Sequence, residues 1–227
     1  PELIAAKVKE VRADIGLALD GDGDRLIVVD EKGEIVDGDH IMAICAAELM
    51  SRKKLRKKTL VATVMSNLGL EVAMGRLGGR LVRTKVGDRY VVEEMRSGHY
   101  NFGGEQSGHL IFLDHATTGD GILAALQLMA IMLKHDQPVS KLAGIMEAFP
   151  QVLKNVRTSR RLDLEALPEF QKACRQMEEK LGADGRILVR LSGTEPLVRV
   201  MIEGANHDQI DQMADELCAL LRKADGQ

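Results

Sequence analysis

The sequence predicts an α/β fold in which a mixed, mainly parallel sheet domain with helices on both faces is followed by a small α+β C-terminal domain and preceded by the tail of another α/β domain. Helical and strand-like apolar patterns alternate from residue 38 to about residue 150, which is typical of β-α-β units. The rhythm breaks around Pro150, and short strands with two helices follow. Residues 1–37 offer one helix and a hairpin, too little to bury a core alone.

The first 37 residues are expected to form a helix and two strands. Glu2 to Val8 repeats apolar residues at helical spacing, and Pro1 stands where a first helical turn tolerates proline. Strands are expected at 15–19 and 26–29, separated by an acidic glycine loop. Because the chain opens without methionine, we expect a partial chain.

The expected elements alternate between residues 38 and 150. After the acidic cap at Asp37, helices are expected at about 41–49, 66–77, 88–95, 120–134 and 139–146, and strands at 60–65, 80–83 and 110–113. Beyond the break, strands are expected at 152–156, 186–191 and 197–203, and helices at 164–181 and 207–223. We therefore expect three parts: residues 1–37, 38–150 and 151–227.

The composition describes a globular protein with no general attraction to nucleic acid or to an anionic membrane. Of its 227 residues, 45% are hydrophobic and 29% charged, and the formal net charge is −3. The basic run at 52–58 ends an amphipathic helix and aromatic residues make up only 3%, so a solvated helix end is favoured over a nucleic-acid site. No apolar stretch approaches the roughly 20 residues of a membrane span. The three separated cysteines indicate a reducing, cytoplasmic compartment.

An acidic loop carries three carboxylates at every second residue. Asp20, Asp22 and Asp24 alternate with Gly21 and Gly23, which let the backbone bring the charges together. Such charges repel one another unless a cation joins them, and a small set of oxygen ligands favours Mg²⁺. The sequence therefore predicts a magnesium site.

Two alternatives to a magnesium loop remain open, an EF-hand calcium loop and a solvated acidic turn. The three aspartates and Glu31 fall on the ligand positions of an EF-hand loop, but Arg25 stands where that loop needs glycine, and the flanks indicate strands where an EF-hand has helices. Arg25 instead favours phosphate chemistry, because a guanidinium beside a metal can bind phosphate oxygens bidentately.

A second polar loop, Gly103 to His109, precedes the apolar strand at 110–113. Glu105, Ser107 and His109 could bind the hydroxyls of a sugar, or supply a nucleophile and a base for hydrolysis. The spacing does not match the Gly-x-Ser-x-Gly elbow of hydrolases, and a plain polar turn is equally consistent with it.

Two further segments could face an anion. Arg190 to Arg199 joins two strands through a turn with two hydroxyls, exposed amides and an arginine on each side, which suits a phosphate dianion; a hairpin turn with surface arginines is the alternative. Lys85 to Arg89 lies between a strand and a helix, where helix amides and two basic side chains could do the same.

Taken in order, these loops resemble those of the α-D-phosphohexomutase superfamily. Gly-Glu-Gln-Ser-Gly-His and Arg-Leu-Ser-Gly-Thr-Glu-Pro are similar to the motifs of its glucosamine-phosphate branch, and the resemblance covers nearly the whole chain. It implies a four-domain enzyme that interconverts glucosamine 6-phosphate and glucosamine 1-phosphate on the route to UDP-N-acetylglucosamine. Residues 1–37 would end domain 2, 38–150 would form domain 3 and 151–227 domain 4.

The resemblance also implies a role for each motif residue. Asp20, Asp22 and Asp24 would hold Mg²⁺, and Arg25 would steady the moving phosphoryl group. Glu105 and Ser107 would hold sugar hydroxyls, while His109 and Lys85 would line the substrate site. The non-reacting phosphate would be bound by the residues of the third loop: Arg190, Ser192, Gly193, Thr194 and Arg199.

One motif of the superfamily has no counterpart in the sequence. No loop like Thr-Ala-Ser-His-Asn-Pro occurs, so the serine that carries the phosphoryl group in the family is absent. We therefore expect a C-terminal portion that needs the N-terminal domains of the same enzyme, and no mutase activity from these residues alone. A mutase for phosphomannose or phosphoglucose is the nearest alternative, although Gln106 stands where those relatives commonly have methionine. A calcium-binding module is a second alternative.

Overall fold

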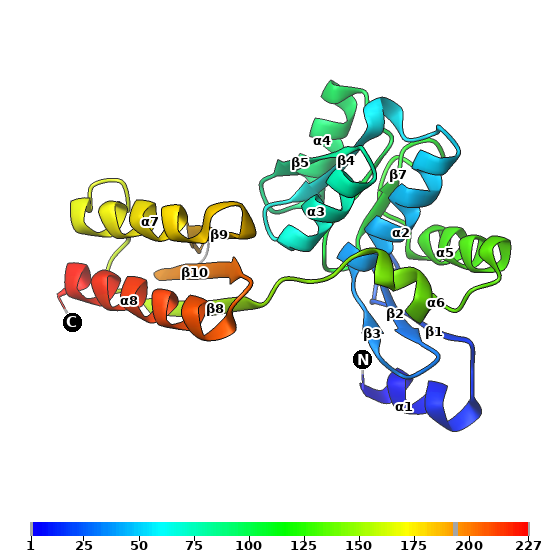
Figure 1. Cartoon of the computed structure of the whole chain (residues 1–227), viewed down its shortest axis with the longest axis horizontal. Helices are drawn as coiled ribbons and strands as arrows, with labels where there is room; N and C mark the ends of the chain where they lie inside the picture. Colours follow the sequence, from blue (N-terminus) through cyan, green and yellow to red (C-terminus); the bar gives the residue numbers. More distant parts are fainter. Residues whose placement is uncertain (1, 193–194, 227) are drawn as a thin grey trace. The chain divides into compact units, whose positions relative to one another are not determined.

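The computed structural model describes residues 2–192 and 195–226, and the chain divides into two compact units, residues 1–148 and 149–227 (Figure 1). The described strands form three sheets: β1-β2-β3 and β5-β4-β6-β7 in the first unit and β8-β10-β9 in the second. The predicted α/β class with a mixed, mainly parallel sheet is confirmed. The three-part division into 1–37, 38–150 and 151–227 stays a prediction.

The first unit opens with a helix and an antiparallel sheet. These elements are α1 (Glu2–Val11), β1 (Ile15–Leu19), β2 (Leu26–Asp30) and β3 (Ile35–Val36). Leu26, Val28 and Val36 are buried in the same core as the larger sheet that follows, whereas Leu3 of α1 is 87% exposed. The hairpin therefore buries its apolar face against the next sheet, and the two-residue strand β3 was too short to be predicted.

The larger sheet alternates with helices. Its elements are α2 (Gly38–Ser51), β4 (Thr59–Thr63), α3 (Leu68–Arg76), β5 (Arg80–Thr84), α4 (Asp88–Gly98), β6 (Phe102–Gly104), β7 (Leu110–Phe112), α5 (Gly121–His135) and α6 (Val139–Leu142), with 3-10 turns at Arg56–Lys58 and Ala143–Ile145. Strand β4 runs parallel to β5 and β6, and β7 returns antiparallel to β6.

Helices cover both faces of this sheet, as predicted. Every residue of β4 is buried, and its side chains alternate between two apolar clusters. Leu60 and Ala62 pack in the cluster that contains the buried residues of α2, α3 and α5, whereas Val61 packs with Val91 and Met95 of α4. A strand buried on both faces is the reason for the unbroken apolar run in the sequence.

Strand β6 was missed, because two of its three residues are glycines. An added Cβ at Gly103 would lie 2.7 Å from the Val61 carbonyl oxygen and 2.8 Å from Met95 Sδ. Glycine here lets the neighbouring strand and helix α4 approach closely. In the sequence, two successive glycines are typical of a loop, so the strand was not predicted.

The second unit is a three-stranded antiparallel sheet with two helices. Its elements are β8 (Gln151–Arg157), α7 (Pro168–Leu181), a 3-10 turn at Gly182–Asp184, β9 (Gly185–Leu191), β10 (Leu197–Gly204) and α8 (His207–Asp225). Val198, Val200 and Ile202 of the central strand pack with the apolar residues of both helices. The helix predicted from residue 164 begins instead at Pro168, because proline fits the first helical turn and not the interior.

Among the described residues, none of the helices combines the length and the apolar character that a bilayer crossing requires.

Candidate metal and sugar-phosphate site

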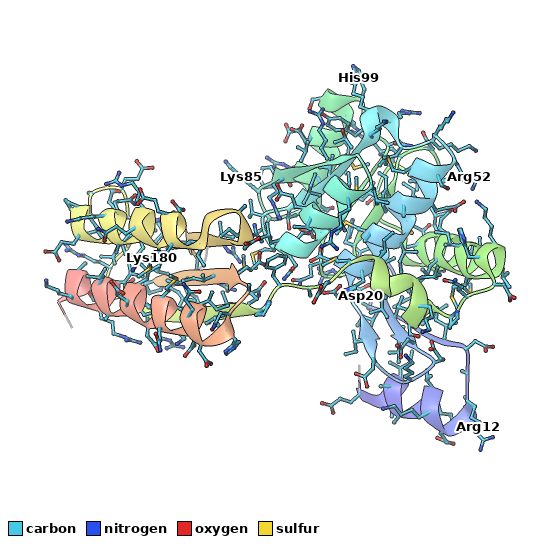
Figure 2. The ribbon with its side chains drawn as sticks, in the orientation of Figure 1. Arg12, Asp20, Arg52, Lys85, His99 and Lys180 are labelled. Carbon is cyan, nitrogen blue, oxygen red and sulfur yellow. The ribbon has the colours of Figure 1, made fainter. Side chains whose placement is uncertain are left out.

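The acidic loop gathers its three carboxylates between β1 and β2. Asp20, Asp22 and Asp24 each offer an oxygen, and these oxygens lie within 4.8 Å of one another. Gly23 adopts a φ of +77°, and its amide donates to the Asp20 carbonyl at 3.2 Å, which closes the turn. Figure 2 shows Asp20 at the end of the hairpin that adjoins the larger sheet. The predicted ligands are therefore brought together, and their role in holding a metal stays a prediction.

Arg25 folds back onto this loop. Its amide donates to Asp20 Oδ1 at 3.2 Å, and its Nε lies 3.6 Å from Asp20 Oδ2 and 4.0 Å from Asp24 Oδ1. Desolvation is the largest single effect and works against ionisation of Asp20. The hydrogen bond from the Arg25 amide, the side-chain interactions with Asp24 and Asp22 and the Arg25 charge together outweigh it and hold the pKa of Asp20 below its usual value. The guanidinium is about half exposed, so it can also reach an anion outside the loop.

The calcium-module alternative does not fit the structure. The loop is flanked by the paired strands β1 and β2, and an EF-hand requires a helix on each side. Glu31, which would be the last ligand of such a loop, accepts a hydrogen bond from Ser140 of α6 instead.

The polar loop Gly103 to His109, predicted to bind sugar hydroxyls and called the sugar loop below, is a tight turn between β6 and β7. The Glu105 amide donates to the His109 carbonyl at 2.9 Å, and the Gly108 amide, at a φ of +92°, donates to the Glu105 carbonyl at 3.0 Å. Glu105 Oε1 accepts from the Gly87 amide at 3.0 Å, which joins this loop to the basic loop before α4. Ser107 is exposed at the tip. The loop thus presents a carboxylate and a hydroxyl.

Backbone contacts tie the sugar loop to the acidic loop. The Leu26 amide donates to the Gly108 carbonyl at 3.0 Å, and the backbones of Arg25 and His109 form an isolated antiparallel β-bridge. An added Cβ at Gly108 would lie 2.1 Å from the Leu26 carbonyl oxygen, so only glycine permits this approach. Two loops more than 75 residues apart in the sequence therefore lie side by side.

Two glycines that the sequence did not single out complete this junction. The Gly38 amide donates to the Gln106 carbonyl, and the Gly121 amide donates to the Gly23 carbonyl, both at 3.0 Å. They begin α2 and α5, so the first turn of each helix rests on one of the loops. The available signal was a glycine directly after an aspartate cap, at Asp37 and Asp120.

His109 is turned away from solvent. Its side chain is 4% exposed, and Nδ1 lies 3.1 Å from Asp24 Oδ2. The family resemblance implied that this imidazole lines the substrate site, and in the structure Nδ1 faces the acidic loop. A role in contact with substrate stays a prediction.

Lys85 lies in the basic loop between β5 and α4. Its side chain is exposed, and Nζ lies 6.0 Å from the centre of the Tyr90 ring. The Arg89 guanidinium lies 5.2 Å from the centre of the same ring. Gly87 precedes the helix and takes a φ of +125°. The hydrogen bond from the Gly87 amide to the Glu105 side chain places this basic loop, Lys85 to Arg89, beside the sugar loop.

The segment Arg190 to Arg199, predicted to bind a phosphate and called the phosphate loop below, includes the turn between β9 and β10 in the second unit. Arg190 and Arg199 are direct partners in the strand register, and the Ser192 amide donates to the Leu197 carbonyl at 2.7 Å. Burial and the nearby Arg199 charge lower the pKa of Arg190, and Arg199 Nε is buried without a hydrogen-bond partner in the described parts of the chain. A cavity of about 200 Å³ lies beside Ser192 and Arg161. Gly193 and Thr194, also predicted here, lie outside the described residues.

Family models match both units of the chain. Residues 37–149 match the description "Phosphoglucomutase/phosphomannomutase, alpha/beta/alpha domain III", and residues 153–220 match "Phosphoglucomutase/phosphomannomutase, C-terminal domain". The chain belongs to this phosphohexomutase family.

Individual relatives agree with the family. The chain is 64% identical to the phosphoglucosamine mutase of Desulfotalea psychrophila over 98% of its own residues and 50% of that protein. It thus spans about half the length of the curated phosphohexomutases it matches. Two structures of Aspergillus fumigatus N-acetylphosphoglucosamine mutase share the fold. One has a TM-score of 0.80 at 23% identity, covering 99% of this chain and 53% of that one. The other, a complex with GlcNAc-6P and magnesium, has a TM-score of 0.76 at 22% identity, covering 97% and 53%.

Proposed function

We propose that the chain forms the metal-, sugar- and phosphate-binding half of a phosphoglucosamine mutase, which interconverts glucosamine 6-phosphate and glucosamine 1-phosphate through a phosphoserine enzyme and a bisphosphate intermediate. The observation that carries the proposal is the hydrogen bond from the Leu26 amide to the Gly108 carbonyl. It joins the sugar loop to the strand that directly follows the acidic loop. A cation site and a hydroxyl-binding site held at a fixed separation are what transfer of a phosphoryl group to a sugar requires.

The acidic loop suits Mg²⁺ in two respects. Three carboxylate oxygens lie close enough to share one ion, and Asp24 Oδ1 is buried without a hydrogen-bond partner among the described residues. A bound Mg²⁺ would supply positive charge against the phosphoryl oxygens. Asp20 and Asp22 would complete the protein's share of the ligands, and Arg25 would bind the moving phosphoryl group.

The remaining residues would hold the substrate. Glu105 and Ser107 would bind sugar hydroxyls, and Lys85 would add positive charge beside them. Arg190 and Arg199 would bind the non-reacting phosphate together with the rest of the third loop: Ser192, Gly193 and Thr194. Like charges opposite each other in a sheet are unfavourable, and an anion between the two arginines would relieve the repulsion.

Part of the machinery would come from elsewhere in the enzyme. The phosphoryl-carrying serine would be supplied by N-terminal domains of the same protein, working in the cytoplasm, and no nucleic-acid or membrane partner is proposed. We expect no turnover by the 227-residue chain by itself.

A chimera tests the proposal. The matching half of the D. psychrophila relative would be replaced by this chain, and conversion of glucosamine 6-phosphate would be followed in a coupled assay. We expect turnover by the chimera and a large loss in its Asp22→Asn variant, which changes an exposed carboxylate without changing its shape. A folded chimera that is inactive on glucosamine 6-phosphate would contradict the proposal. One that prefers mannose 6-phosphate or glucose 6-phosphate would move it to the nearest alternative.

A further inference from the structure

A row of polar side chains crosses all three strands of the second unit. Arg199 of the central strand β10 pairs directly with Arg190 of β9 on one side and with Asn155 of β8 on the other. The neighbouring residues Val198 and Val200 pack with the helices, so Arg199 lies on the opposite face of the sheet. Direct partners in an antiparallel sheet share a face, and the three side chains therefore form one row there.

This row holds two positive charges and no negative charge. Burial and the Arg199 charge lower the pKa of Arg190, and Arg199 Nε is buried with no hydrogen-bond partner among the described residues. Glu203 lies on the same face of β10, but it accepts a hydrogen bond from Arg186 Nε at 2.6 Å. Because that carboxylate is paired with another arginine, an anion bound at the row would supply the missing countercharge.

The sheet limits where such an anion can lie. The next row along this face is apolar, because Met201 of β10 pairs with Leu188 and Leu153, and Met201 is only 1% exposed. On the other side of the polar row, Ser192 follows directly after β9 and begins the turn of the phosphate loop. Contact between a charged group and an apolar surface is unfavourable, so an anion is confined to the end of the sheet beside the phosphate loop.

Asn155 is the uncharged member of the polar row. Its side chain is exposed, and a carboxamide carries both an acceptor oxygen and an NH₂ group with two donors. The oxygen suits the guanidinium of the neighbouring strand, and the NH₂ group suits an anion. A third cation at this position would add repulsion to the row, and a carboxylate would take the place of the anion.

We propose that Asn155 is a further phosphate-binding residue, which acts together with Arg190 and Arg199 on the non-reacting phosphate of the substrate. Its Oδ1 accepts from the Arg199 guanidinium, and its Nδ2 donates to a phosphate oxygen. The phosphate site then extends from the phosphate loop to β8, a strand that no motif of the sequence singled out. The inference rests on the proposed function, because it takes a sugar phosphate as the ligand.

The test measures binding of inorganic phosphate by the 227-residue chain. Binding is followed as the rise of the melting temperature with phosphate concentration and as the movement of the arginine Nε–H signals in nitrogen-15 NMR. Asn155→Leu removes the carboxamide, and Asn155→Asp puts a carboxylate opposite Arg199. Asn206→Asp is the matched control, because the exposed Asn206 caps α8 by accepting from the Gln209 amide, and aspartate caps a helix equally well. It adds the same charge to the same unit at a position outside the row.

We expect Asn155→Leu to bind phosphate roughly ten-fold more weakly than the parent, because a hydrogen bond to a charged group is lost. Asn155→Asp should bind at least as weakly. It should also melt at a higher temperature than the parent in phosphate-free buffer, because its carboxylate balances the charge of Arg199. Asn206→Asp should stay within about two-fold of the parent, since an exposed charge outside the row is screened by salt.

Equal phosphate affinity of the parent and Asn155→Leu would overturn the inference and leave the arginine pair standing as the phosphate site. Equal weakening by Asn155→Asp and Asn206→Asp would also overturn it, because net charge alone would then explain the loss. Absence of phosphate binding by the parent would overturn the phosphate site, and the inference with it.

Kinetics of the chimera separate this role from the chemical step. Loss of a contact to the non-reacting phosphate weakens binding of the substrate and of the transition state alike. Asn155→Leu should therefore raise the KM for glucosamine 6-phosphate roughly ten-fold and leave kcat within about two-fold of the parent chimera. A fall in kcat at unchanged KM would contradict the inference. An inactive chimera would contradict the proposed function, while the phosphate affinities would still decide the role of Asn155.

Discussion

Gly38 supports the sugar loop, and replacing it with alanine should displace that loop. An alanine Cβ would lie 2.3 Å from the Glu105 carbonyl oxygen, 2.7 Å from the Gln106 carbonyl oxygen and 2.8 Å from the Gly108 amide nitrogen. All three are backbone atoms, so no side-chain rotation relieves the clash. The loop must move as a whole.

The expected cost combines two effects. Overpacking a close contact typically costs roughly 1–3 kcal/mol. A shift of the loop also breaks the bond from the Gly38 amide to the Gln106 carbonyl, which contributes roughly 0.5–1.5 kcal/mol. Together they predict a loss of roughly 1.5–4.5 kcal/mol in the free energy of unfolding of the first unit.

Gly75→Ala provides the matched control for Gly38→Ala. Gly75 lies inside α3 with no atom within 4 Å of an added Cβ, so alanine there should stabilise by roughly 0.5–1 kcal/mol. Because the chain has no tryptophan, urea unfolding would be followed by circular dichroism, and hydrogen exchange would report on peptides 38–51 and 103–109 separately. Unchanged exchange in both peptides together with an unchanged unfolding midpoint would refute the reasoning.

Three further substitutions probe charges that are buried or partly buried. Burial raises the pKa of Asp39 to about 7, so the stability present below pH 3.8 should be lost as pH rises toward 7. Asp39→Asn should therefore stabilise the protein at pH 8 by up to roughly 4 kcal/mol. Urea unfolding should show a much smaller gain at pH 4. Burial works against ionisation of Glu48, but hydrogen bonds from α5, including that of Lys134, hold its pKa below 4.5. Glu48→Gln should lower the free energy of unfolding at pH 7 by roughly 1–3 kcal/mol. The melting temperature of this variant should also fall less than that of the parent as the pH is lowered. Arg199→Leu should stabilise the second unit by roughly 0.2–1 kcal/mol in phosphate-free buffer, because it removes the repulsion with Arg190, and should abolish stabilisation by added phosphate in the same thermal scan.

Patterns within a short stretch of chain were sufficient to predict most elements and the acidic loop. A strand that is buried on both faces selects apolar residues along its whole length, so the apolar run that contains β4 predicts a buried strand. Carboxylates repeated at every second residue repel one another without a counter-ion, so the aspartates before β2 predict a cation site. The sequence also placed Arg190 and Arg199 on opposite sides of one turn, and the register makes them direct neighbours.

The sequence could not give what depends on approach between distant segments. At Gly103, Gly38 and Gly119 a Cβ would collide with an atom of another segment, so each position needs glycine. In the sequence these glycines cannot be distinguished from glycines in loops. The direction of His109 is a similar case. Its loop position suggested a substrate contact, and only the packing shows the imidazole turned toward Asp24.

The way the loops are distributed has a consequence for the proposed chemistry. The acidic and sugar loops lie in one unit and share backbone hydrogen bonds, so the distance from the proposed cation to the sugar hydroxyl would be set by rigid contacts, as a bond-forming step demands. The phosphate loop lies in the other unit and offers two arginines, whose attraction for a dianion falls off slowly with distance and tolerates small displacements. Under the proposed function, a sugar bisphosphate would present either phosphate to the metal. This combination would suit it, because the reacting end requires fixed geometry while the other end requires only charge. Tightening the phosphate loop should therefore improve binding more than turnover, whereas loosening the junction between Leu26 and Gly108 should reduce turnover first.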